Sequence, residues 1–387
     1  MGLSAAQEVD FFAELRASLG REWEGIFKQR TSARKSKSDG CAFFYRRSRL
    51  HCVAECAVEL NDVARMLGLA PGTEGCQRME RDNIGQLFAM ELPGSKDEAP
   101  GQPSRKEKKP RKEAGGAPPR GNPFPLSGPE ATPPAGPPPL QAFRFVGLKP
   151  RAPREAATPR RLLFVANTHL FWDPRCSDVK QEQARFLVWA LQSFRAAVLS
   201  RLGDEAPPCP CRDCGAILCG DFNSQPIEPV YRLLTAEPEA VALGPLPPVC
   251  APTGPLGAGW GPVLPFRSGM AEVLGAEPPW TNYTEFKARR PSHPLTQATP
   301  HPAPGPRTLG LIAAVLVCPS TGRVPVVSRA APLQGGPPPS EPPPSQLRCV
   351  GVLGIPPHQQ LALQHALPSD QFPSDHISLR AFFELAE

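Results

Sequence analysis

The sequence lacks any apolar run that approaches the roughly 20 residues needed to cross a bilayer. Its best run, residues 309–318, has about half that length. It also has no recognisable signal peptide at its first residues, so the 12 cysteines are expected to be reduced thiols and not a disulfide framework. We therefore expect a soluble intracellular protein, in the cytoplasm, the nucleus or both, with no membrane partner.

The sequence also lacks a clear zinc site. Cys209, Cys211 and Cys214 have the spacing of metal ligands, but no fourth ligand stands at a suitable distance in the sequence, so a loop is favoured over a zinc site. The formal charge of +6 permits a polyanionic partner. Much of that excess lies in the run 105–112, which is typical of a solvated disordered segment, with nucleic-acid steering as the alternative.

Proline is abundant and unevenly placed. The chain has 53 prolines, and they concentrate in segments 93–158 and 288–346, which are poor in aromatic residues. Such segments bury too little apolar surface to offset the entropy of ordering, so both are predicted to be disordered insertions; docking to a partner's aromatic groove is the alternative. The globular part of the chain is then 1–92, 159–287 and 347–387.

The globular parts alternate between helical and strand patterns. Residues 11–19 repeat apolar positions at helical spacing and stop at Gly20, and residues 181–199 predict a second helix. Residues 41–45 and 162–166 predict strands, the latter buried on both faces. This pattern indicates an α/β protein and is consistent with two sheets packed face to face with helices outside.

The stretch CGDFNS at 219–224 places two polar side chains directly after an apolar run. Side chains two apart on a strand share a face, so Asp221 and Asn223 are predicted to point together from the strand's C-terminal end. Catalytic groups of layered α/β proteins commonly lie at such strand ends. The pair therefore predicts part of a magnesium and phosphate site.

Three further positions offer similar chemistry. Glu8 supplies a hard oxygen ligand, His169 follows a buried strand, and Asp375 precedes His376. Carboxylates suit magnesium, imidazoles move protons or contact phosphate oxygens, and amides donate to developing negative charge. Each position alone also fits a plain structural role, such as a helix start, a core histidine or a cap. The order of these residues along the chain, and their occurrence together with Asp221 and Asn223, favour the functional interpretation.

Nine motifs together carry a resemblance to a known family. They are QEVD at 7–10, SDGCAFFYR at 38–46, VELNDVA at 58–64, RDNIG at 81–85, VANTHLFWDP with SDVK at 165–180, CGDFNSQP at 219–226, TNYTEFK at 281–287, VGVLG at 350–354 and FPSDHISL at 372–379. In these motifs the chain resembles the exonuclease–endonuclease–phosphatase superfamily, and within it the carbon catabolite repressor-type poly(A) deadenylases. The nocturnin and angel branches are neighbours.

The resemblance implies a two-layer β-sandwich flanked by helices, like that of deoxyribonuclease I, with the site at one edge of the paired sheets. Segments 1–92, 159–287 and 347–387 then become three parts of one catalytic domain. The catalytic residues that the resemblance implies are His376, Asp221, Asn223, His169 and Asp375. Those implied to bind magnesium, with manganese as a substitute, are Glu8 and Asp221. Those implied to bind substrate are Asn167, Pro174, Asn223 and Phe286.

The chain departs from the family pattern in two places. The first strand or strands that precede QEV in the family are expected to be missing, which would leave a sheet edge exposed. After Phe286, segment 288–346 takes the place of a core strand whose aspartate orients the catalytic histidine, and no aspartate occurs between Asp221 and Asp370. A translated intron or a paralogue that has lost activity would both explain this replacement.

The resemblance implies a magnesium-dependent 3′-to-5′ exoribonuclease that removes poly(A) and releases 5′-AMP in mRNA decay, impaired in this chain if the replaced strand is essential. Its partners are expected to be the poly(A) tail and subunits of a deadenylase complex, although the leucine-rich repeats that bind such subunits are absent. Two alternatives stay open: a catalytically weak or inactive paralogue that acts as an RNA-binding or scaffold protein, or a phosphodiesterase acting on 2′,5′-oligoadenylate or a dinucleotide phosphate.

Overall fold

The computed structural model of the chain describes ten stretches of the sequence. They are residues 2–31, 39–93, 144–146, 160–204, 211–235, 266–278, 281, 313–318, 347–355 and 378–385. Residue 93, where the first insertion is proposed to begin, is described, whereas the other proposed boundaries at 158, 288 and 346 and most residues of both insertions lie outside these stretches.

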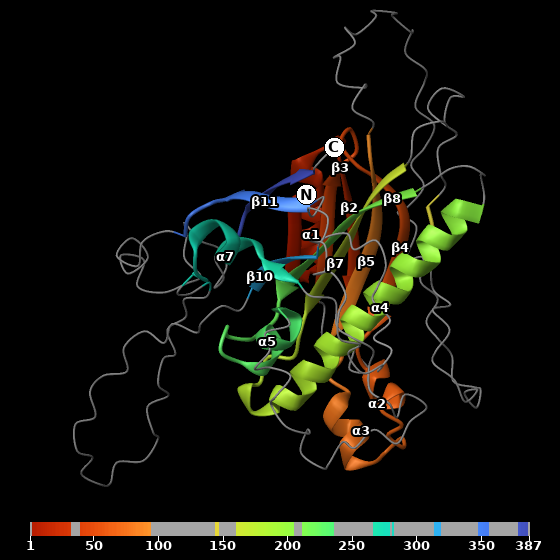
Figure 1. Cartoon of the computed structure of the whole chain (residues 1–387). Helices are drawn as coiled ribbons and strands as arrows, with labels where there is room; N and C mark the ends of the chain where they lie inside the picture. Colours follow the sequence, from red (N-terminus) through yellow and green to blue (C-terminus); the bar gives the residue numbers. More distant parts are fainter. Residues whose placement is uncertain are drawn as a thin grey trace, which may run out of the picture.

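A seven-stranded mixed sheet forms the centre of the molecule, with strand order β6-β4-β5-β7-β8-β10-β9 (Figure 1). Its strands are β4 (His51–Glu59), β5 (Ile84–Leu92), β6 (Arg144–Phe145), β7 (Arg160–His169), β8 (Cys211–Asp221), β9 (Arg267–Ser268) and β10 (Ala313–Cys318). The neighbours β7 and β8 run parallel, and the other pairs are antiparallel. The parallel pair requires a crossover, which the long helix between these strands supplies.

Strand β7 is buried on both faces, as the apolar run at 162–166 predicts. Leu162 and Phe164 join the core on the helical side of the sheet, whereas Leu163 and Val165 join the core on the opposite side. This alternation follows from the two-residue period of a strand. Continuing the period places the side chain of His169 on the same face as Leu163 and Val165.

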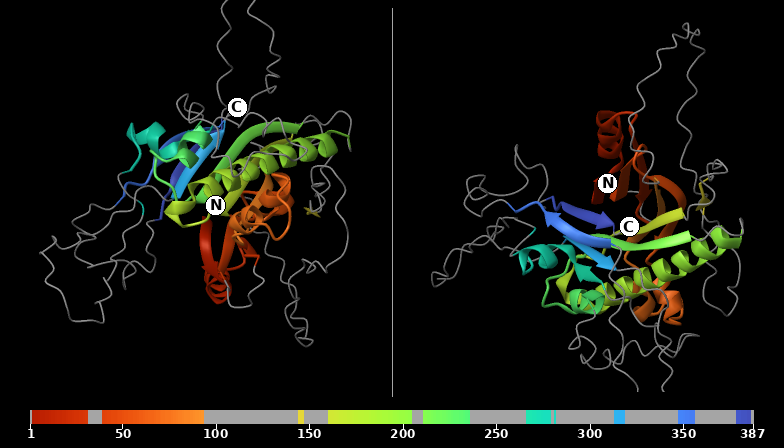
Figure 2. Two further views of the ribbon diagram at one scale, coloured as in Figure 1. Left: turned by 90° about the horizontal axis from the view of Figure 1, so that it is seen from below. Right: turned by 45° about the horizontal axis from the view of Figure 1, so that its top comes forward.

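The second layer lies on that opposite face, and it consists of two separate pieces (Figure 2). One is a three-stranded sheet of order β1-β3-β2, formed by β1 (Gly2–Glu8), β2 (Trp23–Gln29) and β3 (Asp39–Arg46). The other is the pair β11 (Leu347–Val352) and β12 (Ala381–Leu385). Phe43 of β3 and Leu347 of β11 both pack into the core between the layers. The predicted two-layer sandwich is therefore confirmed.

Helices cover the other face of the central sheet. The longest is α4 (Ser177–Asp204), which begins four residues before the helix predicted at 181–199 and ends five residues after it. The remaining helices are α1 (Val9–Leu19), α2 (Asp62–Met66), α3 (Glu74–Met79), the short 3-10 helix η1 (Pro174–Cys176), α5 (Pro229–Thr235) and α7 (Gly269–Leu274). Helix α1 instead lies beside the small sheet, where Phe12 contacts Phe27 and Phe44. None of the helices in the described stretches is long and apolar enough to span a membrane.

Two strands correct the sequence-based expectations. Strand β1 (Gly2–Glu8) is not one of them, because it contains Gln7 and Glu8 of the QEVD motif and is therefore not a strand that precedes this motif. Arg144–Phe145 form β6, so the predicted disorder of 93–158 fails at these residues. Ala313–Cys318 form β10, which pairs with β8 along its length, so segment 288–346 itself supplies a strand to the core sheet. In each case a free strand edge offers backbone hydrogen bonds that local composition does not reveal.

Candidate active site

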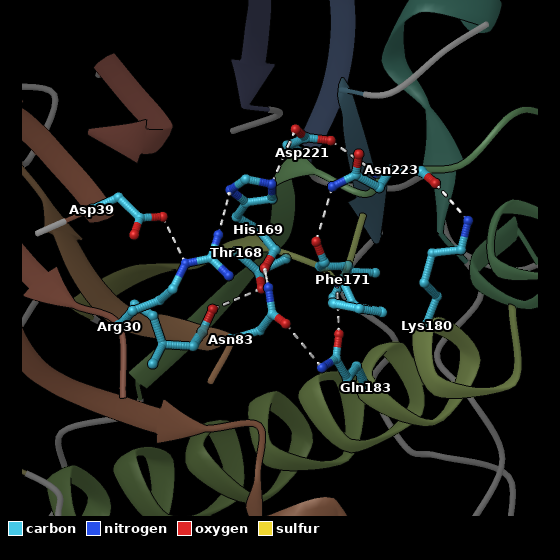
Figure 3. Close-up of polar contacts among 12 residues, drawn as sticks. Arg30, Asp39, Asn83, Thr168, His169, Phe171, Lys180, Gln183, Asp221 and Asn223 are labelled. Atoms are coloured by element: carbon cyan, nitrogen blue, oxygen red, sulfur yellow. Dashed lines mark hydrogen bonds and ion pairs between the residues drawn. The ribbon is translucent and has the colours of Figure 1, made fainter. Parts of the chain in front are cut away.

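His169 and Asp221 lie side by side because they end the two parallel strands. They are direct partners in the β7–β8 register, and both side chains face the second layer. His169 Nε2 lies 3.4 Å from Asp221 Oδ2 (Figure 3). The Asp221 side chain is only 8% exposed, so its charge is poorly screened by water. Burial and pairing of this kind are typical of a functional carboxylate.

A tight turn after β8 positions Asn223. The backbone N–H of Asn223 donates to Asp221 Oδ1 at 2.8 Å. Asn223 has a left-handed φ of 47°, which asparagine tolerates well. The turn begins at Gly220, where a Cβ atom would come within 1.9 Å of the Thr168 carbonyl oxygen, so only glycine fits. The strand ends at Asp221, and the expected shared strand face for Asp221 and Asn223 is therefore wrong: a turn, and not the strand period, brings them together.

Arg30 and Asp39 extend this arrangement on the other side of His169. Arg30 Nη2 lies 3.4 Å from His169 Nδ1, and Arg30 Nε donates to Asp39 Oδ2 at 2.6 Å (Figure 3). A guanidinium can only donate, so Nδ1 of His169 must accept and the neutral ring carries its proton on Nε2. That proton points towards Asp221. The two neighbours of the ring thus fix both its tautomer and its orientation.

The backbone around His169 is held by buried amides. Asn83 is 1% exposed and donates to the His169 carbonyl oxygen at 2.7 Å. Gln183 of α4 donates to Asn83 Oδ1 at 3.3 Å and accepts from the Phe171 amide at 2.9 Å. Asn223 Nδ2 donates to the Leu170 carbonyl oxygen at 2.9 Å. Satisfied buried networks of this kind are rigid, because breaking any one bond leaves a desolvated polar group.

Two residues of the SDVK motif at 177–180 make structural contacts near the site. Lys180 is almost wholly buried and donates to the Asn223 carbonyl oxygen at 2.7 Å, with Glu228 Oε2 at 3.4 Å. Asp178 accepts two bonds from Arg78 of α3, at 2.7 and 2.8 Å. The first contact anchors the turn that carries Asn223, and the second ties α3 to the start of α4.

The Arg78–Asp178 pair predicts an acid-sensitive contribution to stability. Burial raises the pKa of Asp178, but the hydrogen bonds and charge of Arg78 outweigh it and leave that pKa below its usual value. Arg78→Gln should therefore lower the free energy of unfolding by up to about 1 kcal/mol at neutral pH. The difference should be full above the unfolded pKa of about 4 and vanish as the pH falls through the lowered folded pKa. Urea unfolding at several pH values measures it.

An exposed pair provides the control for this measurement. Arg16 bonds Glu24 at 3.3 Å with 54% of its side chain exposed, so Arg16→Gln should change stability by less than about 0.5 kcal/mol. A stability difference for Arg78→Gln that persists in acid would contradict the electrostatic explanation.

Two buried cysteines lie close to the site without taking part in nucleophilic chemistry. Burial raises the pKa of Cys41 to about 12, while Arg30 opposes and Asp39 and Asp221 add to that rise. Burial likewise raises the pKa of Cys219. A neutral thiol is a poor nucleophile and a poor metal ligand, so neither cysteine competes with the oxygen and nitrogen groups. Neither is part of a disulfide, nor are the other cysteines whose state the structure describes.

The residues at this edge suit a hard cation by their chemistry. Glu8 closes β1, stands opposite Asp39 in the β1–β3 register, and β1 packs against β7 and β8. This backbone arrangement brings Glu8 to the sheet edge that carries Asp221. Carboxylate oxygens are the ligands magnesium prefers. Among the side chains that the structure describes, no three of His, Cys, Asp and Glu form a metal-binding group by themselves.

The other predicted site residues have different outcomes. Asn167 is fully buried, and its amide donates to the Ala42 carbonyl oxygen at 3.1 Å and to Gln86 Oε1 at 3.2 Å. It therefore links the two layers, and its expected role in substrate binding stays a prediction. Pro174 is exposed at the start of η1. Phe286, Asp375 and His376 lie outside the described residues.

Sequence reasoning missed several residues of the site. Three of them lie inside motifs of the resemblance: Asp39 in SDGCAFFYR, Asn83 in RDNIG and Lys180 in SDVK. The motifs therefore marked these positions but did not indicate what the side chains do. Arg30 lies outside every motif, 139 residues from His169, and no local pattern marks it.

Known proteins resemble this chain in sequence and in fold. No protein-family model matches the chain. It is 30% identical over 236 residues to carbon catabolite repressor protein 4 homolog 4 of Arabidopsis thaliana, covering 59% of this chain and 44% of that protein. It is 27% identical over 223 residues to CCR4-NOT transcription complex subunit 6-like-B of Xenopus laevis, covering 56% and 30%. The chain thus spans less than half the length of these two relatives.

The structure is similar to a crystal structure of ANGEL2, a 2′,3′-cyclic phosphatase, in complex with adenosine-2′,3′-vanadate. The TM-score is 0.51 at 17% identity, and the match covers 100% of this chain and 81% of that one. At this level of identity the match reports the fold alone. Together these similarities confirm the resemblance drawn from the motifs and the predicted fold.

Proposed function

We propose that this chain, which has carbon catabolite repressor 4 proteins as relatives and the fold of the exonuclease–endonuclease–phosphatase superfamily, is a magnesium-dependent 3′-to-5′ exoribonuclease that shortens poly(A). The observation that carries the proposal is the grouping of His169, Asp221 and Asn223 at the ends of β7 and β8. A buried carboxylate, a histidine of defined tautomer and an amide make a site for a phosphodiester.

Each residue of the site has a proposed role. Glu8 and Asp221 would hold magnesium, or manganese in its place. When bound, the ion supplies positive charge that activates water and stabilises the charge on the phosphate. His169 is proposed to contact a phosphate oxygen, which would compete with Asp221 for the Nε2 proton, and Asn223 lies beside the pair as a further polar group. His376, with Asp375 next to it, is the proposed partner of the attacking water.

Substrate specificity is proposed to come from the surface beside this site. Pro174 and Phe286 are the residues assigned to hold an adenine base, and Pro174 is exposed where such contact needs it. Flat apolar surfaces stack on any base and give about 1–3 kcal/mol per base. The partners we propose are poly(A) RNA and subunits of a deadenylase complex.

The proposal is tested by incubating the full chain with 5′-labelled oligoadenylate in magnesium and, separately, in EDTA. We expect a ladder of shortened products and free 5′-AMP with magnesium, and neither with EDTA. Binding of the RNA without cleavage in either buffer would instead support a catalytically inactive RNA-binding protein. Cleavage confined to 2′,5′-linked oligoadenylate or a dinucleotide phosphate would change the substrate while keeping the chemistry.

A further inference from the structure

Trp172 is a large aromatic side chain left in solvent beside the site. Trp172 is 64% exposed, whereas the preceding Phe171 is partly buried and packs against the core. An indole left in water does not gain the favourable free energy of apolar burial. Aromatic side chains contribute much of that free energy in cores and interfaces. An exposed aromatic side chain of this size next to a functional site indicates a surface that binds a ligand or another molecule.

The loop that carries Trp172 is fixed on both sides of it. Phe171 is held by Gln183 at its amide and lies under the guanidinium of Arg81, 4.9 Å from the ring centroid. Asp173 is 7% exposed and accepts from both the amide and the side chain of Arg175, at 2.9 and 2.8 Å. These bonds lower the pKa of Asp173 to about 2, so its charge is permanent at physiological pH. The indole is thus presented by an ordered backbone.

The loop also adjoins the phosphodiester site directly. Asn223 bonds the carbonyl oxygen of Leu170, two residues before Trp172. Consecutive Cα atoms are about 3.8 Å apart, so the Cα atom of Trp172 lies within about 7 Å of the Cα atom of Leu170, whose carbonyl oxygen accepts from the Asn223 side chain. That separation is within reach of a nucleotide next to the one being cleaved.

We propose that Trp172 is a stacking platform for a second nucleobase of a single-stranded polynucleotide, an inference that rests on the proposed function and adds a binding position to it. Indole faces stack on any base, and flanking arginines attract the phosphates that join the bases. Arg81 supplies such a charge beside Phe171, and the Arg175 side chain is 85% exposed. The exposed neighbours of Trp172 are the small apolar Pro174 and the charged Arg175, which do not form the broad apolar patch of a protein-binding surface.

The test measures RNA affinity without catalysis. Fluorescence anisotropy of a labelled oligoadenylate of about ten nucleotides in EDTA gives the dissociation constant for the full chain. Trp172→Ala should weaken binding by about 5- to 150-fold, and Trp172→Phe should recover most of that loss because it keeps an aromatic face. Quenching of tryptophan fluorescence by RNA should fall in both variants, because the quenched indole is gone.

Phe382→Ala on β12 is the matched control, because Phe382 is a 52% exposed aromatic in the other part of the second layer. It should bind as the wild type does. Trp172→Ala with wild-type affinity would overturn the platform and leave the proposed exonuclease intact. A wild-type protein that neither binds nor cleaves oligoadenylate would overturn both.

Discussion

Asp221→Asn should lower kcat/KM for phosphodiester hydrolysis by about 10²–10⁴-fold while the protein stays folded. Asparagine retains an oxygen that can accept the Asn223 amide, now bonded at 2.8 Å, so the turn after β8 should survive. It removes the negative charge that faces His169 Nε2 and that is proposed to hold magnesium. Initial rates on oligoadenylate, with far-UV circular dichroism as the measure of folding, report the effect.

Asp62→Asn is the control for this prediction. Asp62 pairs with Arg65 at 3.4 Å on the surface of α2, and its side chain is 44% exposed. The same chemical change there should leave the rate within about twofold of the wild type, because exposed pairs contribute little. A full rate for Asp221→Asn would remove Asp221 from the proposed mechanism.

Lys180→Met should be strongly destabilising, by about 3 kcal/mol in the free energy of unfolding. Methionine has a similar length but no ammonium, so the Asn223 carbonyl oxygen loses the donor now at 2.7 Å. Glu228 also loses its cation, although its 31% exposed side chain regains some water. The expected fall in Tm is roughly 6–12 °C for a domain of this size. Guanidinium unfolding and a thermal melt measure the loss.

Glu228→Gln separates the two contacts of Lys180. A glutamine oxygen at this position still accepts from the Gln225 amide, which Glu228 now does at 3.1 Å, and the Lys180 bond to Asn223 remains. The variant should therefore lose less than about 1 kcal/mol. If Lys180→Met proves no less stable than Glu228→Gln, the lysine does not anchor the turn.

The elements of the fold could largely be predicted from local sequence. The apolar run at 162–166 and the helical spacing at 181–199 appear as β7 and α4, because a buried strand and a core-facing helix each impose their own apolar pattern. The expectation of disorder for 288–346 failed at Ala313–Cys318 for a related reason. Prolines dominate the average composition of that segment, whereas strand formation depends on the short apolar run and on the free edge of β8.

The site was predictable in part. Asp221, Asn223 and His169 follow apolar runs, and strand ends are where such groups gather. The depth at which Asn167 lies could not be predicted, because the two-residue strand period establishes the face of a side chain and not its burial. Its burial between the layers depends on Ala42 and Gln86, which belong to other strands.

The sequence by itself determined the alternation of helices and strands and the chemical types of the candidate residues, since both are properties of neighbours along the chain. Only the tertiary structure decided how those residues act together. Pairing of β7 with β8 placed His169 against Asp221, packing of the second layer brought Arg30 to the histidine ring, and Lys180 of a distant helix fixed the Asn223 turn. Hydrogen bonds and ion pairs act over a few ångströms in space, so contacts between residues far apart in the chain follow only from the folded backbone.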